Sequence, residues 1–300
     1  MIPKAKALKL IAIYLYICEL YDQKLQYSVQ RYSNNDKPVF TDQEIMTVYL
    51  FSVHQEQRFN IKRIHTFADD YLRSWFPNLP SYQAFNNRVN RLGEAFRIVA
   101  EHNFSHFIPE SCSKEISLLD SMPIITCSGR RKAQVALEIT NKEYCATKSM
   151  YFHGVKLHTL AFSRPEKLPF PERIVITAAA ESDLNVFKQE WEQIQSRIFI
   201  GDKIYSNKDY FSDLEKKSGS VMITPVRAVK DQPEVTRQRN KAADDLFSAA
   251  VSRIRQPIES IFNWIIEKTD IQRASKVRST NGLFVHVFGK IAAAFIYLMF

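Results

Sequence analysis

Residues 150–162 read MYFHGVKLHTLAF, a long run in which every second residue from Val155 to Ala161 is apolar or β-branched. Side chains alternate between two faces along a strand, so this pattern predicts a β-strand. A β-rich run, EISLLDSMPI, precedes it at 115–124, and another, PERIVITAA, follows a proline-rich turn at 171–179. Three consecutive strands are therefore expected in this part of the chain.

Helical and β-type segments alternate after residue 180. Two short β-rich segments, at 197–202 and 220–225, each follow a predicted helix, and a long helix is predicted over about 241–268. The order of three strands, then helix, strand, helix, strand and helix, is typical of an RNase H-like fold. We therefore expect an α/β domain in which a mixed five-stranded sheet carries flanking helices on both faces.

The sequence before residue 108 is predicted to be entirely helical. Thr41 and Glu44 form a capping box in front of an apolar run, which marks the start of a helix. Ser81 begins a segment that predicts one amphipathic helix over 81–96. Its apolar face carries Phe85, Val89, Leu92 and Phe96.

The composition limits the kind of partner. The chain of 300 residues has 41 Lys and Arg against 32 Asp and Glu, a net charge of +9, which favours a polyanion such as DNA, RNA or an anionic membrane as the partner.

Other classes of protein are disfavoured by the motifs that are absent from the sequence. Its 7 glycines form neither a dinucleotide-binding turn nor a P-loop, and its 4 cysteines form no C-x-x-C pair, so we expect reduced thiols. The apolar stretch after Lys290 is too short to span a bilayer and is predicted to pack as a helix, without a membrane partner.

Three acidic residues stand at distinctive places. Asp120 ends the first predicted strand, Asp202 ends the strand at 197–202, and Glu259 borders the apolar stripe of the last long helix. If that helix crosses the two strands, the carboxylates meet at one edge of the sheet, where Mg²⁺ ions would offset their repulsion and could catalyse phosphodiester chemistry. The alternative is that each is a surface or capping acid, with Glu259 paired to Arg255 one helical turn earlier.

Candidate DNA contacts fall in three places. The polar face of 81–96 offers Arg88 and Arg91 among asparagines, which suits base reading in a major groove, although both arginines could instead pair with acids of neighbouring helices. Lys156 and His158 share one face of their strand and would lie beside a phosphate if that face is the active one. From residue 271 the chain has no acid, and its candidates for phosphate contact are Arg273, Lys276, Arg278 and Lys290.

Four blocks, in this order, resemble the catalytic blocks of DDE transposases from bacterial insertion sequences: LLDSMPI (118–124), FHGVKLHTLAF (152–162), IGDKIYSNKDY (200–210) and RQPIESIFNWI (255–265). The segments 40–50, 76–92 and 278–299 resemble the subgroup of insertion sequences numbered nine-eight-two. The resemblance covers the chain from about residue 40.

The resemblance implies a catalytic triad of Asp120, Asp202 and Glu259 that binds two Mg²⁺ or Mn²⁺ ions. Lys156 and His158 match a G-x-K-x-H strand of the family.

Arg255 and Glu259 match part of the signature Y-x-x-R-x-x-x-E-x-x-x-x-x-x-K, in which Ser252 and Ile266 stand here in place of Tyr and Lys. We expect Arg255 to contact DNA, and likewise Lys203, which directly follows Asp202.

The function implied is that of a DNA transposase that binds the terminal inverted repeats of its element and performs metal-dependent strand cleavage and transfer. Residues 1–108 would form a helical DNA-binding region, 109–270 an RNase H-like catalytic domain, and 271–300 a basic C-terminal segment with a closing helix. Partners would be repeat and target DNA, with a homodimer assembled on DNA in the bacterial cytoplasm, associated with the nucleoid. An RNase H-like nuclease or resolvase, and a domesticated copy that binds DNA without cutting it, are the alternatives.

Overall fold

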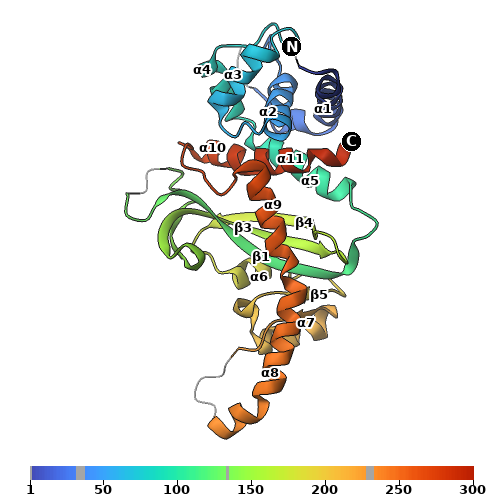
Figure 1. Ribbon diagram of the computed structural model, residues 1–300, viewed down its shortest axis with the longest axis vertical. Coiled ribbons are helices and arrows are strands. Elements are labelled where there is room, and N and C mark those ends of the chain that lie inside the picture. Colours follow the sequence, from blue (N-terminus) through green and yellow to red (C-terminus); the bar gives the residue numbers. More distant parts are fainter. Residues whose placement is uncertain (1, 32–37, 133–134, 228–232) are drawn as a thin grey trace. The chain divides into compact units, whose positions relative to one another are not determined.

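The computed structural model describes residues 2–31, 38–132, 135–227 and 233–300 (Figure 1). The chain forms two compact units. The helical unit comprises Met1–Phe107, Ile124–Gly154 and Ile265–Phe300, and the sheet unit comprises Ile108–Pro123 and Val155–Trp264. The C-terminal residues, which we expected to form a separate part, therefore belong to the same unit as the N-terminal helices.

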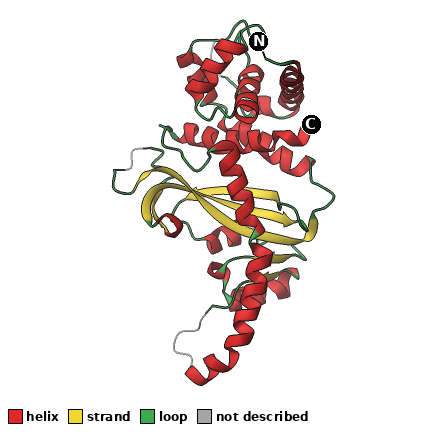
Figure 2. Ribbon diagram, in the orientation of Figure 1, coloured by secondary structure: helices red, strands yellow, loops and turns green. Residues whose placement is uncertain are grey.

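A single mixed sheet contains all the expected strands (Figure 2). Its strands are β1 (Ser113–Ser128), β2 (Asn141–Cys145), β3 (Met150–Ser163), β4 (Phe170–Ala178), β5 (Ile198–Ile200) and β6 (Val221–Ile223). Their order is β2-β3-β1-β5-β6, with β4 also paired to β3. β3 is antiparallel to β2 and β4, whereas β5 is parallel to β1 and β6. The predicted mixed sheet is confirmed, and β2 is a sixth strand that the sequence did not predict.

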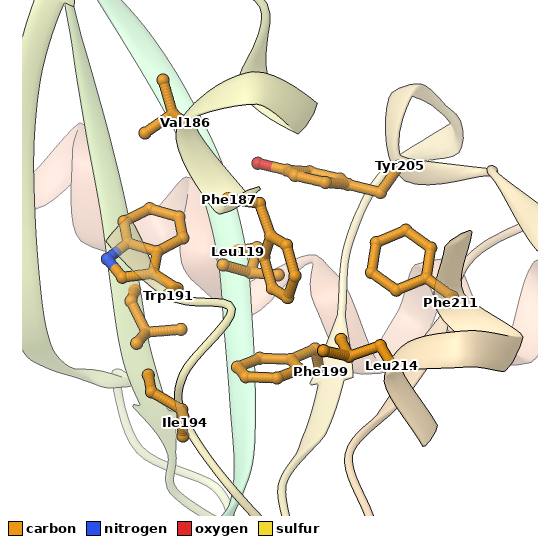
Figure 3. Close-up of a cluster of buried hydrophobic side chains, with 10 residues drawn as sticks. Leu119, Val186, Phe187, Trp191, Ile194, Phe199, Tyr205, Phe211 and Leu214 are labelled. Carbon is orange, nitrogen blue, oxygen red and sulfur yellow. The ribbon is translucent and has the colours of Figure 1, made fainter. Parts of the chain in front are cut away.

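Successive residues of β1 build the two cores of the sheet unit. Leu118 packs with Ile200 of β5 and with Val251 and Ile258 of the long C-terminal helices. Leu119 faces the other way, into a larger cluster rich in aromatic rings (Figure 3). Helices therefore cover both faces, as predicted. Four helices do so: α6 (Asp183–Glu190), α7 (Lys208–Ser218), α8 (Glu234–Arg255) and α9 (Pro257–Thr269).

The long helix predicted over 241–268 is two helices. α8 begins earlier than expected and ends at Arg255, and α9 begins at Pro257. Proline has no N–H to donate and is favoured at the first position of a helix, which explains the division. Ile254, next to the end of α8, is 50% exposed, while Ile258 of α9 is fully buried. The break places Glu259 in the first turn of α9.

The helical unit confirms the predicted all-helical N-terminal region. Its helices are α1 (Lys4–Gln23), α2 (Asp42–Glu56), α3 (Ile61–Tyr71), α4 (Tyr82–Val89), α5 (Gly93–His106), α10 (Thr280–Phe284) and α11 (Lys290–Phe295). Short 3₁₀ or π turns occur in this unit at Leu25–Tyr27, Ala146–Lys148, Val285–Gly289 and Ile296–Met299, and in the sheet unit at Lys203–Tyr205. The capping box of Thr41 and Glu44 is present.

The predicted helix over 81–96 is interrupted. α4 ends at Val89 and α5 begins at Gly93, so the asparagine- and arginine-rich face is not continuous. A side chain at Gly93 would lie 2.8 Å from Cβ of Phe284, and glycine permits this close approach. The apolar positions of both helices are nevertheless buried as expected.

The C-terminal residues pack as a core helix. Among the described residues, Thr280–Met299 is the one stretch long and apolar enough to cross a membrane, and 67% of it is buried inside the protein. Phe295 contacts Phe104 of α5, and Tyr49 of α2 donates a hydrogen bond to the Val285 carbonyl. The expectation of a packed helix is confirmed.

Gly154, the glycine of the G-x-K-x-H block, is required by the sheet. A Cβ at this position would lie 2.0 Å from the backbone oxygen of Ile124. We predict that Gly154→Ala lowers the free energy of unfolding by at least about 2 kcal/mol, because backbone must shift to admit the methyl group. Chemical denaturation measures this. Gly219→Ala, at a φ of +66° where a Cβ would make only an ordinary contact with the Ser196 hydroxyl at 3.8 Å, should cost only about 1 kcal/mol, and equal losses would contradict the steric explanation.

Candidate active site

The Arg255 guanidinium links two of the three predicted acids. Its Nη1 donates to Asp120 Oδ2 at 2.7 Å, and its Nη2 donates to Glu259 Oε1 at 2.6 Å. Asp120 points toward α8 and α9 because it shares the face of Leu118 on β1. The alternative that Glu259 pairs with Arg255 is thus observed, and the same arginine also brings Glu259 to Asp120.

Burial dominates the electrostatics of Asp120. It raises the pKa of this carboxyl to about 6, although the charge of Arg255 and the backbone N–H of Ser121 act in the opposite direction. Burial by itself lowers the pKa of Arg255, but the charges of Asp120, Glu259 and Asp202 outweigh it and raise this pKa above its ordinary value. The cluster therefore holds an excess of negative charge.

Asp202 follows β5 and is exposed. Its Oδ1 accepts a hydrogen bond from the backbone N–H of Lys203, which caps the 3₁₀ turn after the strand. It is close enough to act on the charge of Arg255 and on the buried Tyr205 hydroxyl. Two of the three acids thus bind Arg255, and Asp202 acts on it electrostatically without an ion pair.

A fourth acid lies on the opposite face of β1. Asp183, the first residue of α6, is only 9% exposed and accepts a hydrogen bond from the Ser121 hydroxyl. Lys156 Nζ lies 3.3 Å and His158 Nδ1 3.2 Å from its Oδ1. Burial alone would raise the pKa of Asp183, but His158 and Lys156 outweigh it and hold this pKa below its usual range.

The three predicted acids have the chemistry of a divalent-cation site. No three His, Cys, Asp or Glu side chains in the described ranges lie close enough together to hold a metal ion as they stand. Yet Asp120, Asp202 and Glu259 offer only oxygen donors, as Mg²⁺ and Mn²⁺ prefer, and two of them are already neutralised by a cation. The donor atoms of these three acids therefore fit the Mg²⁺ or Mn²⁺ ions that the sequence predicted.

Residues 111–296 match the family model described as Transposase DDE domain. The chain belongs to this family of DDE transposases. No curated protein and no solved structure matches the chain. The family is associated with DNA transposition by mobile elements, and it implies that this transposase acts on DNA.

The structure changes the expected role of His158 in this transposase. Lys156 and His158 do share one face of β3, as predicted, but that face turns toward α6. His158 is fully buried, and its Nε2 lies 2.8 Å from the Thr177 hydroxyl, a placement that favours support of Asp183 over the DNA contact we expected. Lys203 is exposed beside Asp202 and stays a candidate DNA contact.

Arg88 and Arg91 have different surroundings. Arg88 forms an ion pair at 2.9 Å with the buried Asp42, which Arg31 also contacts. This favours the alternative in which Arg88 pairs with an acid of a neighbouring helix. Arg91 is exposed, and no ion pair engages it within the described part of the transposase.

The basic C-terminal segment is only partly available for phosphate contact. Arg273, Lys276 and Arg278 are exposed. Lys290 is not, because its side chain is 2% exposed and its Nζ donates to the backbone oxygen of Asp270. Burial lowers the pKa of Lys290 to about 7. We therefore correct the expectation that Lys290 contacts phosphate: it belongs to the core of the helical unit.

Sequence reasoning missed Asp183, Ser121 and Tyr205. Asp183 stands at the start of a helix, where an acidic residue is common for reasons of capping and helix dipole. Tyr205 is almost fully buried, and its hydroxyl has no hydrogen-bond partner among the described residues. One sequence signal could have revealed Asp183. Lys156 and His158 lie on the same face of one strand, and two such side chains need an acidic partner when they are packed against a helix.

We predict that Asp183→Ala destabilises the protein by about 3 kcal/mol or more, because it leaves the half-buried Lys156 and the fully buried His158 without their common partner. Urea denaturation at pH 7 measures the loss. Asp213→Ala is the matched control, since it removes an exposed acid and should change stability by less than about 0.5 kcal/mol. If both variants unfolded at the same urea concentration, the contacts of Asp183 would contribute nothing to the fold.

Substitution of Arg88 should affect mainly stability, whereas substitution of Arg91 should affect mainly DNA binding. Arg88→Ala should lower the free energy of unfolding by about 1–3 kcal/mol, because Asp42 keeps only Arg31. Arg91→Ala should leave stability within about 0.5 kcal/mol of wild type and weaken DNA binding. Thermal melting and fluorescence anisotropy with labelled duplex DNA measure the two effects. Unchanged DNA affinity for Arg91→Ala would remove this residue from the DNA contacts.

Proposed function

We propose that this DDE transposase binds the terminal inverted repeats of its own element, cleaves the strand at each end and joins the freed 3′-hydroxyl to target DNA. The observation that carries the proposal is the convergence of Asp120 and Glu259 on Arg255, with Asp202 within electrostatic reach. Asp120 of β1, Asp202 just after β5 and Glu259 of α9 follow one another in the order of the family signature, and the first and last of them bind one arginine.

The catalytic residues in this proposal are Asp120, Asp202 and Glu259, and they hold two Mg²⁺ or Mn²⁺ ions. Bound ions of this kind neutralise charge on a phosphodiester and activate the attacking oxygen. The protein contributes position: β1 fixes Asp120, β5 fixes Asp202, and the start of α9 fixes Glu259. Arg255 carries five N–H donors beside these acids, which suits a DNA phosphate as well as a carboxylate.

DNA recognition is assigned to exposed cations. Arg91, Lys203, Lys276 and Arg278 have the exposure that phosphate or base contact needs. In this account 1–108 is the DNA-binding region, 109–270 the catalytic domain and 271–300 a basic closing segment. The blocks at 40–50, 76–92 and 278–299 support placement in the subgroup numbered nine-eight-two. The working form is a homodimer on DNA in the cytoplasm, associated with the nucleoid.

We predict that Asp120→Asn, Asp202→Asn and Glu259→Gln each reduce strand cleavage to background while DNA affinity changes by less than about threefold. Each substitution removes a negative charge that binds metal and keeps the shape of the side chain. The assay uses the full chain, Mg²⁺ and an end-labelled duplex that carries the element's terminal repeat. Asp209→Asn and Glu267→Gln, which alter exposed acids, are the matched controls and should cleave as wild type does.

Near wild-type cleavage by any one of the three variants would remove that residue from the site. Equal cleavage of the repeat and of a scrambled duplex would instead indicate an RNase H-like nuclease. Repeat binding by the wild-type chain without any cleavage would indicate a domesticated copy.

A further inference from the structure

The hairpin of β2 and β3 carries exposed aromatic rings at the edge of the sheet. β2 is the last strand in the sheet order, and Tyr144 lies directly opposite Tyr151 in the antiparallel register. Their side chains are 47% and 58% exposed, and their ring centroids are 5.1 Å apart. Buried Phe152 and Cys145 fix the inner face of the same hairpin. The outer face therefore presents two tyrosine rings to solvent.

A lysine lies against one of these rings, and a basic segment begins beside it. Lys142 Nζ lies 5.1 Å from the centroid of the Tyr151 ring. Gly129 donates its backbone N–H to the Tyr151 carbonyl at 2.8 Å, so the segment that follows it leaves the sheet beside this tyrosine. That segment contains Arg130, Arg131 and Lys132, all exposed. No ion pair within the described ranges engages Lys142 or these three residues.

From this arrangement we infer that the tyrosine hairpin, defined as Lys142, Tyr144, Tyr151 and Arg130–Lys132, is a binding site for unpaired DNA. Cations that track a phosphate backbone, together with aromatic rings on which bases stack, are the features by which proteins hold single strands. Bases within a duplex are stacked on each other and cannot offer their faces to a tyrosine. The site therefore prefers a single strand to a duplex of the same sequence.

A purely structural role for the tyrosines is the competing explanation, since cross-strand aromatic pairs stabilise hairpins. The cations distinguish a DNA-binding role of the tyrosines from a purely structural one. A structural pair needs none, whereas here Lys142 lies against the Tyr151 ring and Arg130–Lys132 follow the glycine bonded to Tyr151, with no ion pair to a described residue; Glu143, the acid of β2, projects to the other side of the strand. The inference rests on the proposed function only in naming DNA as the polyanion.

The test compares a labelled 20-nucleotide single strand with its duplex, by fluorescence anisotropy on the full chain at one fixed salt concentration. We expect Tyr144→Ala and Tyr151→Ala each to weaken single-strand binding by at least about fivefold, because each loses a stacked base. Duplex binding should change by less than twofold. Tyr144→Phe and Tyr151→Phe should bind the single strand as wild type does, because they keep the ring. Tyr27→Ala, at a tyrosine 68% exposed elsewhere, is the matched control.

Unchanged single-strand affinity in both alanine variants, or equal losses on single strand and duplex, would overturn the inference. Failure of the wild-type chain to bind any DNA would instead contradict the proposed function. A second measurement needs no variant: a single strand containing 5-bromouracil is photocrosslinked to the wild-type protein, and the linked peptide is identified by mass spectrometry. Crosslinks at Tyr144 or Tyr151 support the site, and crosslinks confined to other peptides contradict it.

Discussion

Two carboxylates that converge on one point need a cation between them, and in this transposase Arg255 supplies it. The guanidinium donates to Asp120 from one nitrogen and to Glu259 from another. The Asp120 carboxyl is largely buried, and without such a partner it would be protonated or would destabilise the fold, whereas the Glu259 side chain is 52% exposed. The position of the arginine depends in turn on the break before Pro257, since Arg255 is the last residue of α8 and Glu259 lies in the first turn of α9.

The alternation of side chains along β1 organises the rest of the sheet unit. Leu118 and Asp120 face α8 and α9, whereas Leu119 and Ser121 face α6. The strand therefore presents an acid of the candidate site on one face and a partner of Asp183 on the other. Lys156 forms an ion pair with Asp183, and of the causes that shift the pKa of Asp120 the charge of Asp183 is the smallest. One strand thus separates a candidate catalytic cluster from a supporting one.

Local patterns were enough to predict five of the six strands, the helical N-terminal region and the capping box at Thr41, because period and capping are properties of short segments. Contacts between distant segments were not predictable in this way. Lys290 begins α11, a helix that packs against α2 and α5, and the partner of Arg88 lies 46 residues away at Asp42. Asp183 was missed for the same reason, since an acid at the start of a helix looks like a cap until Lys156 and His158 are seen beside it.

The central claim is that Asp120, Asp202 and Glu259 act as one metal-holding cluster, and binding of Mn²⁺ to the DNA-free protein tests it most directly. Isothermal titration calorimetry should detect Mn²⁺ binding to the wild-type chain and to Asp209→Asn. The Mn²⁺ affinity of Asp120→Asn should be lower by at least about tenfold. Removing a metal ligand should weaken binding at least as much as removing a residue that only holds a ligand in place. Equal Mn²⁺ affinity in Asp120→Asn and the wild type would contradict the account.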